Sequence, residues 1–203
     1  SQTALSQTGT IIDASIEEFL AAAVGDTQYR LKGVITRITN TTYGNLYLRD
    51  FSDEVYVYGI QEFSTKGLKV GDIITIVGKR AEYNDNPQVG SAVLESFIPV
   101  TPATIAEVLA KPDDPTTYFM VTGEIASIVN DTYGNLNLKD GDDQIYVYGC
   151  YPGYGATGDA RKYLIADKGL KVGDQLTVIA PKGSYQGSPQ LSNSIYFSHV
   201  SSK

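Results

Sequence analysis

The chain has 203 residues, of which 42% are hydrophobic and 19% charged, and this composition excludes a disordered polypeptide. The 16 Lys and Arg residues against 23 Asp and Glu residues give a net charge of −7, with no basic run in either half. This balance argues against strong non-specific binding to duplex nucleic acid, which depends on neutralising phosphates. No stretch approaches the ~20 apolar residues that a membrane-spanning helix needs.

The N-terminal residues 1–9 are small and polar and are expected to form a tail. Because the first residue is Ser rather than Met, we expect that a segment before it, with or without a lipid anchor, has been removed. Residues 13–23 predict a short helix with an apolar stripe at helical spacing, capped by Asp13 or Ser15. Residues 104–110 predict its counterpart in the second half.

A long repeat organises the chain. Residues 40–59, NTTYGNLYLRDFSDEVYVYG, return ninety positions later at 130–149 as NDTYGNLNLKDGDDQIYVYG. The repeat predicts two similar domains after the tail, at 10–100 and 101–203, joined by a linker at 99–102. The second copy carries an insertion at about 150–167, with a glycine-rich loop and a helical turn over 159–165.

Each copy contains five segments with the alternating pattern of β-strands. Gly33 and Gly123 occupy matching positions inside the first and longest strand, where a glycine is typical of a bulge or bend. The predicted strands are 29–40, 45–50, 55–58, 73–81 and 89–100 in the first copy, and 119–130, 135–139, 145–148, 175–182 and 191–200 in the second.

Five short strands with one curved strand and little helix between the third and fourth predict an all-β fold of two tandem five-stranded Greek-key barrels, the pattern of the OB-fold. The motifs YGNLYL, VYVYG, GLKVGD and Y-x-x-x-P-Q resemble OB-fold domains of bacterial cell-envelope lipoproteins that are labelled as nucleic-acid binding. The resemblance covers nearly the whole chain. It implies an extracytoplasmic protein, in the periplasm or at the cell surface.

OB-folds use the outer face of their second and third strands and the flanking loops to bind ligands. Aromatic rings with nearby cations on such a face suit the stacking of unpaired bases, and the same rings can stack on sugars. The alternative is that outward Tyr side chains favour the strand or pack against protein. In the first copy the candidate residues are Tyr43, Tyr47, Arg49, Tyr56, Tyr58, Lys79, Arg80, Tyr83 and Gln88.

The second copy is expected to bind more weakly, because Asn137 stands where the first copy has Tyr47. Tyr43, Tyr58 and Tyr83 recur as Tyr133, Tyr148 and Tyr185, which favours a structural role for these three as much as a functional one. The candidates in the second copy are Tyr133, Lys139, Tyr146, Tyr148, Lys182, Tyr185 and Gln190.

Other motifs give weak signals. The segment GYGATG at 153–158 matches a dinucleotide-binding pattern but lies outside any βαβ unit, so we expect a surface loop. The acidic segment 140–143 lacks the spacing of a calcium loop and predicts a hairpin turn. Cys150 and His199 are the only residues of their types, so a triad or zinc site is not expected. Asn40 and Asn130 begin glycosylation sequons that we interpret as turns.

The sequence therefore predicts a non-enzymatic binding protein without a cofactor or metal. Its expected ligand is single-stranded nucleic acid or an oligosaccharide. The alternative is a scaffold or protein–protein interaction module of the cell envelope, whose Tyr-rich faces contact other proteins.

Overall fold

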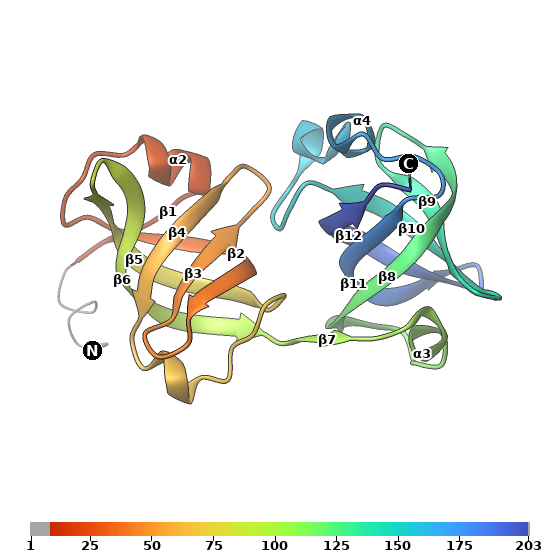
Figure 1. Ribbon diagram of the computed structural model, residues 1–203, viewed down its shortest axis with the longest axis horizontal. Coiled ribbons are helices and arrows are strands. Elements are labelled where there is room, and N and C mark those ends of the chain that lie inside the picture. The colour runs from red at the N-terminus through yellow and green to blue at the C-terminus, as the bar shows by residue number, and fades with distance from the viewer. Residues whose placement is uncertain (1–8, 203) are drawn as a thin grey trace. The chain divides into compact units, whose positions relative to one another are not determined.

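A computed structural model describes residues 9–202 of the chain, which divide into two compact units between Pro99 and Val100 (Figure 1). Each unit holds one six-stranded sheet. The strands of the first unit are β1 (Ile11–Asp13), β2 (Gln28–Asn40), β3 (Asn45–Arg49), β4 (Glu54–Ile60), β5 (Ile73–Tyr83) and β6 (Asn86–Ile98). Those of the second are β7 (Val100–Pro102), β8 (Asp114–Asn130), β9 (Asn135–Asp140), β10 (Asp143–Tyr151), β11 (Gln175–Tyr185) and β12 (Ser188–Val200).

Five strands of the first unit close into a barrel because β2 pairs with a different neighbour along each half. Its residues from Gln28 to Val34 pair with β5, and those from Val34 to Asn40 pair with β3. The barrel continues from β3 to β4, then to β6 in parallel and back to β5. The second unit repeats this order with β8, β9, β10, β12 and β11. The topology confirms the all-β prediction of two tandem Greek-key barrels.

The glycine at the bend of the long strand is required by close approach rather than by its backbone angles. A Cβ atom on Gly33 would lie 2.5 Å from the carbonyl oxygen of Arg49 on β3, and one on Gly123 would lie 3.0 Å from that of Lys139. A side chain at Gly33 would therefore push β3 away from β2 at the point where the barrel turns.

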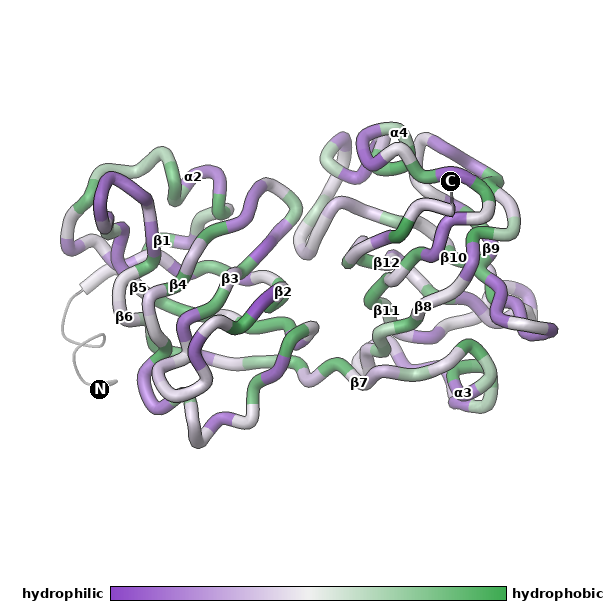
Figure 2. Tube along the Cα trace, viewed as in Figure 1, coloured by the Kyte–Doolittle hydropathy of each residue, from purple (hydrophilic) through white to green (hydrophobic). Residues whose placement is uncertain are grey.

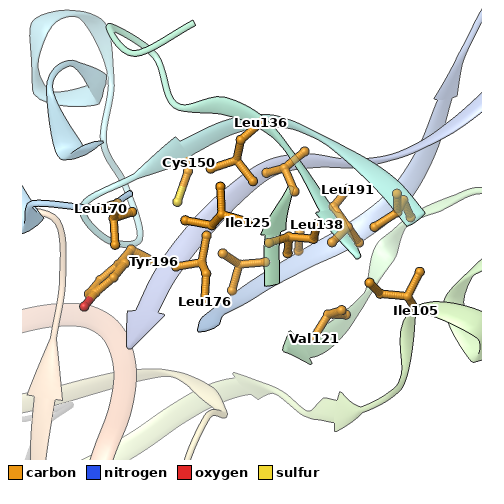
Figure 3. Packing of buried hydrophobic residues seen from close by; sticks show 14 of the residues in the cluster. Ile105, Val121, Ile125, Leu136, Leu138, Cys150, Leu170, Leu176, Leu191 and Tyr196 are labelled. Carbon is orange, nitrogen blue, oxygen red and sulfur yellow. The ribbon is translucent and has the colours of Figure 1, made fainter. Parts of the chain in front are cut away.

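Hydrophobic and hydrophilic residues alternate along the strands of both units, as Figure 2 shows. The inward positions form one core in each barrel; Leu46, Leu48 and Val57 are fully buried in the first unit, and Leu136, Leu138 and Val147 in the second. Figure 3 shows the second core extending from Ile105 and Val121 at one end to Leu170 and Tyr196 at the other.

Short helices lie at both ends of each barrel (Figure 1). They are α2 (Ile16–Ala21) and η1 (Phe63–Thr65) in the first unit, and α3 (Ile105–Leu109) and α4 (Leu164–Lys168) in the second, where η2 (Gly158–Arg161) precedes α4. Ser15 caps α2 and Thr104 caps α3, each in a reciprocal capping box with the Glu three residues later. Of the two caps that the sequence offered for α2, Ser15 is therefore the one used.

The structure corrects three boundaries. Residue 13, expected to begin the helix, instead ends strand β1, which pairs in parallel with β2. Most of the expected linker at 99–102 is strand β7, which pairs in parallel with β8. The expected helical turn over 159–165 is split between η2 and α4. Three-residue strands escaped the prediction because they are too short to show a period of two.

Within residues 9–202, no helix is both long and apolar enough to span a membrane.

Candidate ligand-binding faces

Two Tyr residues form the centre of the candidate face on the first unit. The inward side chains of β3 and β4 are buried aliphatic residues, so the positions between them point outward. Tyr47 on β3 is directly opposite Tyr56 on β4, and the two ring centroids are 5.2 Å apart with a tilt of 51°. Both rings are half-buried, so each retains an accessible part.

Arg37, which was not among the residues predicted from the sequence, extends this pair on the neighbouring strand. The residue is exposed on β2 opposite Tyr47, and its Cζ lies 4.3 Å from the centroid of the Tyr47 ring. This is cation–π stacking distance. On the other side Gln88 of β6 lies beside Tyr56. Arg37, Tyr47, Tyr56 and Gln88 thus form one line across four strands, which we call the first-unit row.

The other candidates of the first unit lie around the row. Arg49 is half-buried on β3, opposite Glu54. Lys79 is exposed on β5, and its aliphatic stem crosses Gly90 of β6, which is also the partner of Tyr58. Tyr83 is 68% exposed at the β5–β6 hairpin. Tyr43 and Tyr58, both exposed, border a separate hollow next to the loop after β4.

Arg80 differs from the expectation that it borders the ligand face. It is only 8% exposed, and its guanidinium donates to the carbonyl oxygens of Ala81 at 2.8 Å and Leu20 at 3.1 Å. The second contact ties β5 to the end of α2. Because Lys79 points outward on the same strand, the neighbouring Arg80 must point inward. Arg80 is therefore a structural residue rather than a ligand contact.

The second unit has a matching line of different chemistry. Ser127 on β8, Asn137 on β9, Tyr146 on β10 and Gln190 on β12 pair in the same order, and we call them the second-unit row. The Asn137 side-chain amide donates to the Ser127 hydroxyl at 3.0 Å. Neither a cation nor a second ring stands where Arg37 and Tyr47 stand in the first unit.

A groove of about 720 Å³ adjoins this second row. Three Tyr residues, one from the row and two beside it, supply its aromatic surface, while Gln190 supplies an amide. The groove is lined by Tyr146, Tyr148, Tyr185, Gln186, Ser188, Pro189 and Gln190. It combines ring faces with uncharged hydrogen-bonding groups.

The remaining candidates of the second unit are engaged elsewhere. Lys182 donates to the carbonyl oxygen of Lys111 at 2.6 Å and lies 3.3 Å from Asp113, with its side chain 11% exposed. The exposed Lys139 lies 3.6 Å from Glu124. The Nζ atom of Lys162, in the insertion, lies 6.0 Å from the ring centroid of Tyr133.

The weak motifs of the sequence have structural roles here. Cys150 is fully buried, burial raises the pKa of its thiol to about 12, and His199 instead contacts the hydroxyl of Tyr196 through Nδ1 at 2.6 Å. The acidic segment 140–143 spans the β9–β10 hairpin turn. The loop at 153–158 is held against η2, since Arg161 Nε donates to the carbonyl oxygen of Ala156 at 3.2 Å. Among residues 9–202, no group of three or more His, Cys, Asp or Glu side chains is placed to hold a metal ion.

No protein-family profile and no curated protein sequence matches the chain. Among solved structures, a murine DNA-binding protein bound to double-stranded DNA is 12% identical, with a TM-score of 0.38 over 85% of this chain and 99% of that one. The hypothetical protein YgiW from E. coli is 16% identical, with a TM-score of 0.33 over 44% of this chain and 97% of its own.

The single-stranded DNA-binding protein from Thermus aquaticus is 14% identical, with a TM-score of 0.26 over 90% of this chain and 95% of that one. Similarity at this level carries no conclusion about what this chain binds, and the assignment of both units as OB-fold barrels rests on their own strand topology.

Proposed function

We propose that the chain is a non-enzymatic binding protein whose first-unit row binds the unpaired bases of single-stranded nucleic acid. The observation that carries this proposal is the line formed by Arg37, Tyr47 and Tyr56, in which a guanidinium and two rings lie side by side on an outward sheet face. Every base has a flat π face, so such a line accepts a base regardless of its identity.

The charges around the row fit a single strand better than a duplex. Arg37 and the half-buried Arg49 flank Tyr47 on the same face, while the chain as a whole carries a net charge of −7. Two cations can neutralise about two phosphates, which predicts a shallow salt dependence with a slope of about −1.4 for a single strand. Stacking rather than charge then supplies most of the binding free energy.

The test is fluorescence anisotropy with labelled DNA and RNA single strands of about 12 nucleotides. We expect binding that weakens roughly sevenfold between 50 and 200 mM salt, and that is lost when both rings are removed in Tyr47→Ala/Tyr56→Ala. The matched control is Asn137→Ala, which changes the corresponding position of the second unit. Absence of binding at low salt, or binding that the double variant retains, would reject the proposal.

A second candidate function is oligosaccharide binding in the groove of the second unit. The specific observation is that Tyr146, Tyr148 and Tyr185 line a groove whose polar groups are uncharged. Rings and amides of this kind suit the apolar faces and hydroxyls of sugars. A glycan array should then give hits that are insensitive to salt and are lost in Tyr146→Ala/Tyr185→Ala but not in Tyr47→Ala/Tyr56→Ala.

We also propose an extracytoplasmic location, on the resemblance of the motifs VYVYG and GLKVGD to those of cell-envelope proteins. Fractionation of the source cells with an antibody against the chain tests it. Recovery with the envelope or the periplasm would support the proposal, and recovery in the cytosol would reject it.

A further inference from the structure

The first unit carries a hollow of about 390 Å³ that is separate from the first-unit row. It lies where β4 ends and the chain turns toward η1, and none of the row residues lines it. We call it the first-unit pocket. Its lining includes Tyr43, Tyr58, Gly59, Gln61, Glu62 and Ser91.

Two backbone features around the first-unit pocket recur at the corresponding place in the second unit. The amide of Ile60 donates to the carbonyl oxygen of Tyr43 at 2.9 Å, and the amide of Cys150 donates to that of Tyr133 at 3.0 Å. Both units also have a residue with positive φ on the last strand, Ser91 at 29° on β6 and Asn193 at 50° on β12. The residues on either side of Ser91 pair with β4, and those on either side of Asn193 pair with β10.

In the second unit the space that corresponds to the first-unit pocket is occupied by a side chain of the same unit. Tyr151 stands where the first unit has Gln61, is only 8% exposed, and donates its hydroxyl hydrogen to the Asn193 amide oxygen at 2.9 Å. Its hydroxyl oxygen lies 2.5 Å from where a Cβ atom on Gly149 would be. The matching glycine of the first unit, Gly59, has no ring beside it; its nearest contacts would be a carbonyl at 3.4 Å and an amide oxygen at 3.7 Å.

Two cationic side chains of the insertion lie over the aromatic rings at this place in the second unit. The Cζ atom of Arg161 lies 5.0 Å from the ring centroid of Tyr151, and Lys162 lies over Tyr133. The amide of Tyr163 then donates to the carbonyl oxygen of Thr132 at 2.7 Å, which fixes the end of the insertion to the same loop. The first unit has no such insertion, and its Tyr43 ring is 68% exposed.

We propose that the first-unit pocket binds a tyrosine side chain and an adjacent Lys or Arg from a loop of a partner protein. The partner would supply in trans what Tyr151, Arg161 and Lys162 supply within the second unit. The Ser91 hydroxyl stands in place of the Asn193 amide as the polar partner of the phenol, and the Tyr43 ring is open to a cation.

Charge complementarity supports a basic partner. Glu62 lies at the edge of the pocket with its side chain 74% exposed, and its neighbouring cation Lys66 is 3.6 Å away. The first unit contains 8 basic and 12 acidic residues, a net charge of −4, which favours a cationic segment. A volume near the lower end of ligand pockets suits one aromatic side chain and its flanking groups.

The test uses a labelled synthetic peptide with the sequence of residues 151–163, YPGYGATGDARKY, added to the full chain. We expect saturable binding that falls at least tenfold in Gln61→Tyr/Ser91→Asn, since this variant gives the first unit the ring and amide that fill the second. The control is Val24→Tyr, which adds a Tyr at an exposed site elsewhere in the unit and should leave binding unchanged.

A second variant tests the proposal even if Gln61→Tyr/Ser91→Asn, which is designed to fill the pocket, destabilises the barrel. Glu62→Lys is at an exposed position and should weaken binding of the peptide severalfold, and a peptide with Glu in place of its Arg and Lys should regain the loss. Absence of binding at millimolar peptide, or binding that neither variant weakens, would overturn the proposal.

Two other occupants of the first-unit pocket, a small phenolic ligand and a second copy of the chain, would give different experimental results. Tyrosinamide that binds as tightly as the peptide would overturn the proposal in favour of a small phenolic ligand. Self-association of the chain that Gln61→Tyr/Ser91→Asn abolishes would likewise replace a different partner protein by a second copy. Neither outcome bears on nucleic-acid binding by the first-unit row, which is measured separately.

Discussion

The two barrels share their inward side chains almost position for position and differ on their outward faces. Leu46 and Leu48 are matched by Leu136 and Leu138 in the two cores. Outside, the guanidinium and ring of Arg37 and Tyr47 are replaced by the hydrogen-bonded pair of Ser127 and Asn137. The core fixes where each outward position lies, while the residue placed there decides which ligand chemistry is available.

The largest predicted difference between the units concerns the bend of the long strand. Gly33→Ala should destabilise the first unit by about 2–3 kcal/mol and Gly123→Ala the second by about 1 kcal/mol, because the added Cβ meets backbone at 2.5 Å in one case and 3.0 Å in the other. Thermal unfolding measures both losses.

Labelling of Cys150 assigns each transition to a unit, since this buried thiol becomes accessible only when the second unit opens. Gly33→Ala should therefore leave the onset of labelling unchanged, and Gly123→Ala should advance it. Equal losses in the two variants would contradict the difference in clearance.

The second prediction exchanges the two rows. Arg37→Ser/Tyr47→Asn should weaken single-strand binding by about 1–2 kcal/mol, or about five- to thirtyfold, through loss of one stacking platform and its cation. Ser127→Arg/Asn137→Tyr should give the second unit measurable binding of the same salt dependence. Anisotropy titrations of both exchanged variants and of their combination measure the effect.

The combined exchange is the control, because it carries one complete row, on the other barrel. Binding recovered in that variant would show that the row is sufficient on either scaffold. A second unit that gains nothing from the graft would show that residues outside the row, such as Arg49, are also required.

The third prediction concerns the contacts that hold the two capped helices, α2 and α3, against their barrels. In the first unit the buried Asp50 accepts the backbone amide of Ile16 at 2.8 Å and that of Ser52 at 2.7 Å, so it joins α2 to the β3–β4 turn. The matching Asp140 is exposed and borders a hollow of about 780 Å³ next to α3. Asp50→Ala should cost about 1–2 kcal/mol and Asp140→Ala close to nothing.

Urea unfolding of the two variants, with Cys150 labelling to separate the units, measures this difference. The result depends on burial rather than on the identity of the residue, since both positions hold Asp. A comparable loss in Asp140→Ala would indicate that α3 is held by a contact to its turn as α2 is.

Much of this arrangement follows from sequence periodicity, and the exceptions have identifiable causes. The alternation in β3 and β4 placed Tyr47 and Tyr56 outward. Arg37 was missed because a bulge between Ile35 and Arg37 shifts the register, so that Arg37 rather than Thr36 lies opposite Tyr47. The strand alternation itself already indicated that Lys79 and Arg80 cannot both point outward.

The filling of the second unit by Tyr151 could not be predicted in this way. The repeat aligns Tyr151 with Gln61, but only the fold shows that the ring turns back over Gly149 to reach Asn193. Tyr151 ends β10 and Asn193 lies on β12, about forty residues further along the chain, so their contact depends on how these two strands are brought together, which local patterns do not specify.

The smallest predicted effect is the acid sensitivity of the second unit. The amides of Ser202 and Lys171 donate to the Asp174 carboxylate at 3.0 and 2.9 Å and hold its pKa below the ordinary value of 3.8. Bonds from Thr104, Ser184 and Thr116 likewise lower the pKa values of three other carboxylates of this unit, Glu107, Asp113 and Asp114.

A carboxylate whose pKa is lowered by folding adds stability above its unfolded pKa, and this contribution disappears as the pH falls through the folded value. The second unit should therefore lose stability progressively below about pH 4, and Asp174→Asn should be less stable near neutral pH but show a flatter dependence on acid. Urea midpoints across this range measure both effects.

Asp142→Asn, in the exposed β9–β10 turn, is the matched control. If Asp174→Asn and the wild type lost stability in parallel as the pH fell, the hydrogen bonds to Asp174 would not be the source of the acid sensitivity, and the segment at Ser202 would have to be held to the barrel by other contacts.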